Sequence, residues 1–168
     1  MSEKSVNGAV SFGERLASSQ VFADLFRSGM ALVEETAAYL DGPGRQESKK
    51  LDRNGALAYA TESMRLTTRL MQLASWLLLH RAVKEGEMSL AQASKEKTKV
   101  KLSAGDFTDE QNLKLLPERL RALIQRSKTL QSAVRRLDAT IHAPPPRIER
   151  GNPVERQLGL LKAAFEQE

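Results

Sequence analysis

The first helical pattern covers residues 19–41, where apolar side chains recur three and four positions apart. This spacing puts them on one face of an α-helix. The positions are Phe22, Leu25, Phe26, Gly29, Leu32, Val33, Thr36 and Leu40. Ser18 or Ser19 can cap the start, because a serine hydroxyl accepts a free backbone N–H. The run DGPG at 41–44 predicts the end of the helix, and the charged stretch 45–53 then reads as a loop.

The second pattern begins between Asp52 and Ala56, with Asp52 or Asn54 as its cap, and continues to about Lys84, which makes it the longest predicted helix. It carries two neighbouring apolar stripes. One holds Leu57, Ala60, Met64, Thr67, Met71, Ala74 and Leu78, and the other holds Tyr59, Ser63, Leu66, Leu70, Leu73 and Leu77. The stripes together occupy more than half of the helix circumference, and only Ser75 is polar between Leu73 and Leu79. We therefore expect both the bundle itself and a second subunit to cover this end of the helix.

The third long pattern follows Pro117, a residue suited to a first helical turn because it lacks an N–H. An earlier start between Thr108 and Leu115, with a junction at the proline, stays open. The apolar stripe consists of Leu120, Leu123, Ile124, Ser127, Leu130, Val134, Leu137 and Ile141, and three prolines at 144–146 end the helix. Before it, Ser89 and Gln92 have the spacing of a capping box, which predicts a short helix.

The C-terminal part contains a further helix start at Asn152-Pro153, with Leu158, Leu161 and Phe165 on one side. The predicted fold is therefore all-α: an antiparallel three-helix bundle with a short extra C-terminal helix or mobile tail. We divide the chain into a flexible N-terminal segment at 1–18, a bundle at 19–143, and a proline-rich linker with a helix or tail at 144–168.

Composition narrows the class of protein. The chain of 168 residues has 40% hydrophobic and only 5% aromatic residues, and it has no cysteine. A disulfide framework is thus excluded, which suits a cytoplasmic protein. The first residues lack the apolar core of an export signal, and the apolar run at 70–79 is about half the roughly 20 residues that span a bilayer. We expect a cytoplasmic protein without a membrane span.

Candidate chemistry is sparse. The two histidines, His80 and His142, have no partner at helical metal-ligand spacing, and no glycine run resembles a phosphate-binding loop. The adjacent acids Glu34-Glu35 and Asp109-Glu110 point to different sides of a helix, so neither pair suggests an acid/base dyad. We therefore expect no catalytic residues, no metal site, no cofactor and no enzymatic activity.

The net charge of +5 raises nucleic acid as a partner. Basic residues crowd the third helix and the linker that holds Lys95, Lys97, Lys99 and Lys101. Acids are mixed with them along most of the chain, and no exposed aromatic pattern accompanies them, so a solvated surface is the favoured interpretation. A basic helical bundle associated with nucleic acid is kept as the alternative function.

Three runs of the sequence resemble the RcdA family, the regulators of CtrA degradation of alphaproteobacteria. They are FGERLASS at 12–19, EETAAYLDGPGR at 34–45 and TTRLMQLASWLL at 67–78. The resemblance covers roughly residues 12–102 and continues more weakly through the third helix. It implies a dimeric three-helix bundle with a mobile C-terminal tail. It also implies a non-enzymatic adaptor that helps the ClpXP protease select cell-cycle regulators such as CtrA, together with CpdR-like and PopA-like proteins.

Two sets of residues are candidates for binding. For a homodimer interface we select Phe22, Phe26, Trp76 and Leu77, since they exceed what one three-helix core needs. For partner binding we select the basic linker residues Lys95, Lys97, Lys99 and Lys101 and the tail residues Leu158, Leu161 and Phe165. Recruitment of the cytoplasmic protein to a cell pole stays open.

Overall fold

The computed structural model describes residue 15, residues 19–97, residues 109–143 and residues 153–165. These residues form helices and contain no strand, so the all-α prediction is confirmed. Three long helices lie side by side: α2 (Gln20–Asp41), α4 (Arg53–Lys84) and α7 (Glu118–Ile141). The short helices are α3 (Pro43–Lys49), α5 (Leu90–Lys97), α6 (Glu110–Lys114) and α8 (Pro153–Phe165). Among the described helices, none is long and apolar enough to cross a membrane.

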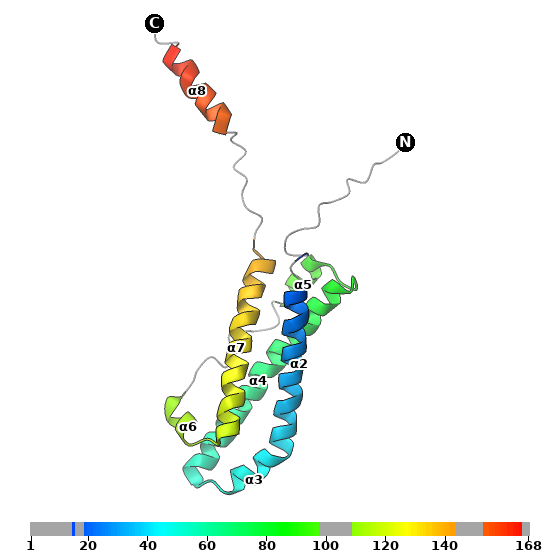
Figure 1. The fold of residues 1–168 in the computed structure, drawn as a ribbon, viewed down its shortest axis with the longest axis vertical. Helices are drawn as coiled ribbons and strands as arrows, with labels where there is room; N and C mark the ends of the chain where they lie inside the picture. The colour runs from blue at the N-terminus through cyan, green and yellow to red at the C-terminus, as the bar shows by residue number, and fades with distance from the viewer. Residues whose placement is uncertain (1–14, 16–18, 98–108, 144–152, 166–168) are drawn as a thin grey trace.

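The three long helices do not simply alternate in direction. Helix α2 runs antiparallel to α4, as predicted, but α4 and α7 run in the same direction (Figure 1). Two hydrogen bonds show this register: Arg69 of α4 donates to Ser127 of α7, and further along Trp76 donates to Asp138. Helix α6, which precedes α7 in the sequence, accordingly lies beside the first half of α4, where Asn112 donates a hydrogen bond to Glu62.

The helix starts predicted from capping residues are confirmed. The Ser19 hydroxyl accepts the N–H of Phe22, and the Asp52 carboxylate accepts the N–H of Gly55 at 2.7 Å. Ser89 and Gln92 form the reciprocal pair of a capping box, with distances of 2.9 and 3.1 Å. Because each cap satisfies backbone donors that the helix leaves unpaired, short sequence signals were enough to place these ends.

The predicted loop at 45–53 is wrong in its first half, since α3 occupies Pro43–Lys49. Pro43 stops α2 but stands in the first turn of α3, where its missing N–H costs nothing. The short helix has no apolar stripe that could have revealed it. A hydrogen bond from α2 holds it in place, since the Tyr39 hydroxyl donates to the Glu47 carboxylate.

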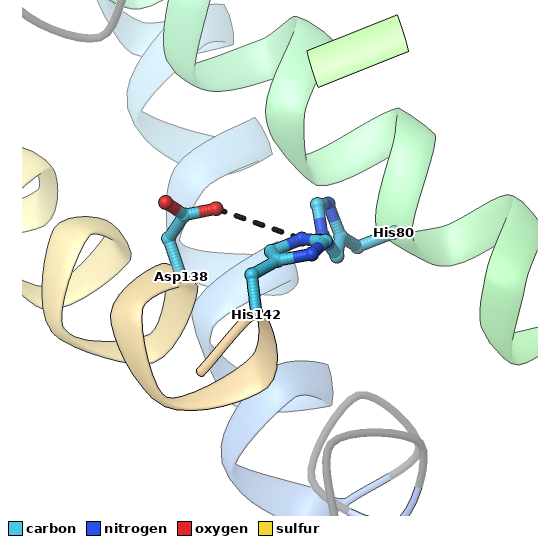
Figure 2. A group of neighbouring side chains, drawn as sticks. All are labelled: His80, Asp138 and His142. Atoms are coloured by element: carbon cyan, nitrogen blue, oxygen red, sulfur yellow. Dashed lines mark hydrogen bonds and ion pairs between the residues drawn. The ribbon is translucent and has the colours of Figure 1, made fainter. Parts of the chain in front are cut away.

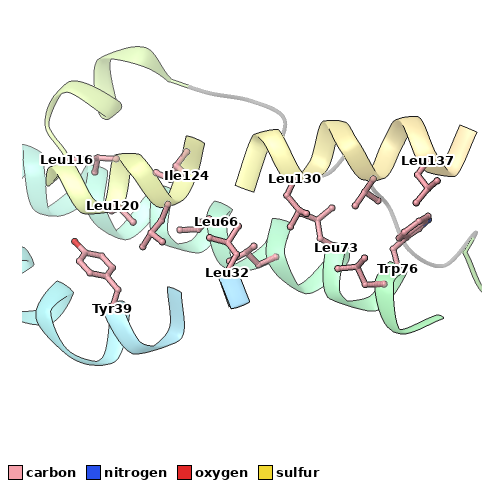
Figure 3. Packing of buried hydrophobic residues seen from close by; sticks show 14 of the residues in the cluster. Leu32, Tyr39, Leu66, Leu73, Trp76, Leu116, Leu120, Ile124, Leu130 and Leu137 are labelled. Atoms are coloured by element: carbon pink, nitrogen blue, oxygen red, sulfur yellow. The ribbon is translucent and has the colours of Figure 1, made fainter. Parts of the chain in front are cut away.

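The core lies between the inner faces of the three long helices (Figure 3). It is built largely from leucines and contains three large aromatic side chains, Phe22, Tyr39 and Trp76, that are fully buried. The second of the two predicted stripes of α4 supplies Leu66, Leu70, Leu73 and Leu77 to this core. The core stripe of α7 is confirmed, because all eight positions predicted for it are buried: Leu120, Leu123, Ile124, Ser127, Leu130, Val134, Leu137 and Ile141.

Gly44 is required by the close packing of α3 on α2. A methyl group at this position would lie 2.6 Å from the Tyr59 hydroxyl and 2.7 Å from the backbone carbonyl of Tyr39. A backbone atom cannot move aside as a flexible side chain can. The contact between α2, α3 and the start of α4 therefore depends on the absence of a side chain here.

We predict that Gly44→Ala lowers the free energy of unfolding by about 1–3 kcal/mol, the usual cost of overpacking. Urea denaturation would measure it. The matched control is Gly159→Ala in α8, where an added methyl group meets nothing within 4 Å. Equal stability of the Gly44→Ala variant and the native chain would contradict the packing described here.

Candidate interaction surfaces

The outer side of α4 carries four large apolar side chains in a row. Leu57, Met64, Met71 and Leu78 follow one another at intervals of seven residues, and each is 54–73% exposed. Seven residues are close to two helical turns, so these side chains form one line that is about 32 Å long. They belong to the first predicted stripe, which the chain itself leaves uncovered.

The same side of α4 has no exposed charge. Between residues 54 and 78 every exposed position of α4 is apolar, small or neutral polar, although 28% of the whole chain is charged. Ala60, Thr67 and Ala74 stand three positions after the first three large residues and offer small side chains where another helix could approach. We call the line Leu57, Met64, Met71 and Leu78, with Ala60, Thr67 and Ala74, the α4 face.

A groove borders this face where α2 and α4 meet. Its volume is about 300 Å³. It is lined mainly by apolar side chains, including Val33, Ala37 and Leu40 of α2 and Met71 and Ala74 of α4. The apolar surface thus extends from α4 onto the neighbouring helix.

The residues selected from the sequence for a dimer interface lie elsewhere. Phe22, Trp76 and Leu77 are 1%, 0% and 0% exposed, and Phe26 is half-buried against the core. The premise that these side chains exceed the needs of one core is wrong, because the single chain buries three of them. Periodicity alone could not tell which of the two stripes of α4 faces inward.

The basic residues selected for partner binding are divided by the structure. Lys95 is exposed on α5, whereas Lys97 turns toward α7 and forms an ion pair with Asp138 at 2.8 Å. Lys99 and Lys101 lie outside the described residues. Lys97 is therefore engaged within the chain.

Helix α8 presents apolar side chains to solvent. Leu158 and Leu161 are 58% and 54% exposed, and Leu160 beside them is 68% exposed. The helix predicted at Asn152-Pro153 is confirmed by α8, which starts at Pro153. The side chain of Phe165 lies outside the described part of the chain.

Some of the basic residues of α7 are paired within the bundle. The Arg126 guanidinium contacts the Glu35 carboxylate of α2 at 2.6 Å, and that of Arg119 lies over the Tyr39 ring, 5.2 Å from its centre. These contacts reduce the charge that α7 offers to a phosphate backbone.

A polar cluster lies where α4 and α7 end. His80, Asp138 and His142 point toward one another (Figure 2), and one nitrogen or oxygen atom from each lies within 4.8 Å of the others. His80 Nε2 is 2.8 Å from His142 Nε2, which is 3.7 Å from Asp138 Oδ1. Imidazole and carboxylate are common metal ligands, so among the described residues these three could hold a metal ion.

The hydrogen bonds around His80 determine its tautomer. Its Nδ1 lies 2.9 Å from the carbonyl oxygen of Trp76, which can only accept, so Nδ1 carries the proton. Nε2 of neutral His80 then accepts a hydrogen bond, and His142 Nε2–H donates it. Burial lowers the pKa of His80 to about 4, and burial also lowers the pKa of His142, with Lys97 adding to that effect. Both rings are therefore neutral at pH 7.

Sequence reasoning did not find this cluster. His80 and His142 are 62 positions apart, and only the parallel register of α4 and α7 unites them. A sequence signal did exist, since each histidine falls at the end of a predicted long helix. It had no meaning until the relative direction of the helices was known.

Comparison with known proteins identifies close relatives. A family model described as "Protein of unknown function (DUF1465)" matches residues 13–165. RcdA from Caulobacter crescentus CB15, known from a crystal structure, is 51% identical in sequence to this chain. The two structures match with a TM-score of 0.66, over 79% of this chain and 99% of that chain. No curated protein matches the chain.

Proposed function

Because the chain belongs to the RcdA family and matches the DUF1465 family model over most of its length, we propose that it is a non-enzymatic adaptor that binds other proteins. Its task is to help deliver cell-cycle regulators such as CtrA to the ClpXP protease in the cytoplasm. From the same family resemblance, CpdR-like and PopA-like proteins are the expected partner proteins in this delivery.

The uncharged α4 face is the observation that carries this proposal. Four exposed leucine and methionine side chains in one line are costly in water, since burying each is worth roughly 1.5–3 kcal/mol. Large apolar patches on a monomer surface usually mark a protein contact. A binding function explains why a helix in such a charged chain keeps this side neutral.

We assign a second copy of this chain to the α4 face. Large residues that repeat every seven positions, alternating with small ones, allow two helices to pack closely, knobs into holes. A two-fold contact would pair each line with itself and bury the grooves beside it. An area of about 1,600 Å² would make a standard interface. The homodimer predicted from the sequence is thus retained, but through different residues.

The tail provides a separate binding element. Its leucines are exposed on α8, and none of them belongs to the hydrophobic core of the bundle. We propose that α8 binds a cargo or partner protein with Leu158 and Leu161, which leaves the α4 face for the dimer. A single helix of this length is marginal in water and gains stability from the surface it meets.

The adaptor role predicts faster proteolysis of CtrA in a reconstituted reaction. With ClpXP, CpdR-like and PopA-like proteins present, adding this protein should raise the initial rate of CtrA loss several-fold, followed by gel electrophoresis. The rate for an unrelated ClpXP substrate should stay the same. If CtrA disappears at one rate with and without the protein, the proposed cargo is wrong.

The dimer proposal predicts that Met71→Glu converts the protein to a monomer, because a carboxylate at the middle of the α4 face would lose its water on association. Sedimentation at micromolar concentration should show twice 18.6 kDa for the native chain and 18.6 kDa for the variant. Val21→Glu is the control, since Val21 is 61% exposed on α2 and lies on the side of α7, beside Ala133 and Leu137, away from this face. A native monomer, or a dimeric Met71→Glu variant, would refute the assignment.

The tail proposal predicts that truncation after Ala143 leaves the melting temperature within about 2 °C of the native value, because exposed side chains contribute little to folding. The same truncation should slow CtrA delivery. Leu158→Ser with Leu161→Ser in the full chain should reproduce this loss. A fall of several degrees on truncation would instead show that α8 is part of the folded bundle.

A further inference from the structure

We propose that His80, Asp138 and His142 form a binding site for a divalent transition metal ion, Zn²⁺ in particular, that joins the end of α4 to the end of α7. The ligand atoms would be Nε2 of both histidines and one carboxylate oxygen of Asp138 (Figure 2). Two imidazoles and one carboxylate, with water in the fourth position, are a common ligand set for zinc.

Hydrogen bonds from neighbouring residues fix the proposed ligands in the way that is usual at metal sites. A metal-binding histidine usually donates its other N–H to a carbonyl or carboxylate, which fixes the ring. Nδ1 of the fully buried His80 donates to the Trp76 carbonyl, so its Nε2 lone pair points at the cluster. Asp138 is fixed in turn, because Trp76 Nε1 donates to its Oδ1 and Lys97 to its Oδ2, each at 2.8 Å.

The hydrogen bonds of the two rings show which proton must move before a cation enters. Without metal, the only proton between the rings is that of His142 Nε2–H. When the ion takes this place, the proton leaves Nε2 and His142 takes one up at Nδ1, so that the ring remains neutral and no net proton is released from the pair.

Only a small movement separates the two ring nitrogens from the spacing of a metal-bound pair. Two nitrogens bound to a tetrahedral zinc at about 2.0–2.1 Å lie about 3.3 Å apart, whereas His80 Nε2 and His142 Nε2 are 2.8 Å apart. His142 caps the end of α7, where no further helical turn restrains it. A shift of about half an ångström at this end brings the two nitrogens to the coordinated spacing.

Lys97 sets the affinity. Its ammonium group neutralises Asp138 and would repel an incoming cation, so the native site should bind more weakly than the same ligands without it. This makes Lys97 a useful test position. In a purely structural cluster, losing Lys97 can only weaken the fold, whereas in a metal site it must also strengthen binding.

The composition of the chain leaves few other places where zinc could bind in this test. The protein has two histidines and no cysteine, so a zinc site that uses these preferred ligands can form only here. The full-length protein, freed of any histidine tag and treated with EDTA, is titrated with Co²⁺ and then Zn²⁺. We expect one equivalent of Co²⁺ to give the visible absorption of a tetrahedral complex, and Zn²⁺ to remove it.

The variants separate the proposed site from weaker alternatives. His80→Gln and His142→Gln should each lower the affinity for Co²⁺ at least about 10-fold, and Lys97→Met should raise it several-fold. If His80→Gln fails to fold, which circular dichroism reports, Asp138→Asn replaces it as the test of the buried side. No binding by the native chain overturns the proposal. So does binding that depends on His142 alone, which would indicate a surface histidine.

Discussion

The burial of Trp76 is the constraint on which the bundle depends. Its ring is fully buried, packs against Phe22 of α2 with ring centres 6.2 Å apart, and stacks on His80 at 4.0 Å. A buried indole N–H needs an acceptor, and Asp138 of α7 supplies it. One side chain thus joins all three long helices, and it fixes how far α7 slides along α4.

That register determines which surfaces remain for function. Two neighbouring helices can cover only part of the circumference of α4, so its inner stripe enters the core while Leu57, Met64, Met71 and Leu78 stay outside. The chain cannot cover this line with its own long helices, because both of them already pack on the inner side. An uncharged line of this length is what a protein-binding adaptor would present, and it suits a second copy of the same helix.

The same register creates the polar end of the bundle. With α4 and α7 parallel, their last turns meet, and His80 reaches His142 and the carboxylate of Asp138. Two imidazoles meet here a carboxylate held by Trp76 and Lys97, and this is the arrangement that we propose as a metal site. Because α8 follows α7 in the sequence, whatever stabilises this end also fixes the point from which the tail departs.

The sequence by itself determined the helices and most of their ends, because caps such as Ser19, Asp52 and the Ser89–Gln92 pair act over only three or four residues. It also indicated the family and the inner stripe of α7. It missed α3, which has no apolar stripe and is held through Tyr39 and Glu47. It could not decide which stripe of α4 is buried, nor that two histidines 62 positions apart share a hydrogen bond. Those features depend on the direction and register with which the helices pack, and that choice is made by the core as a whole, through contacts such as Trp76 with Asp138 that no local pattern contains.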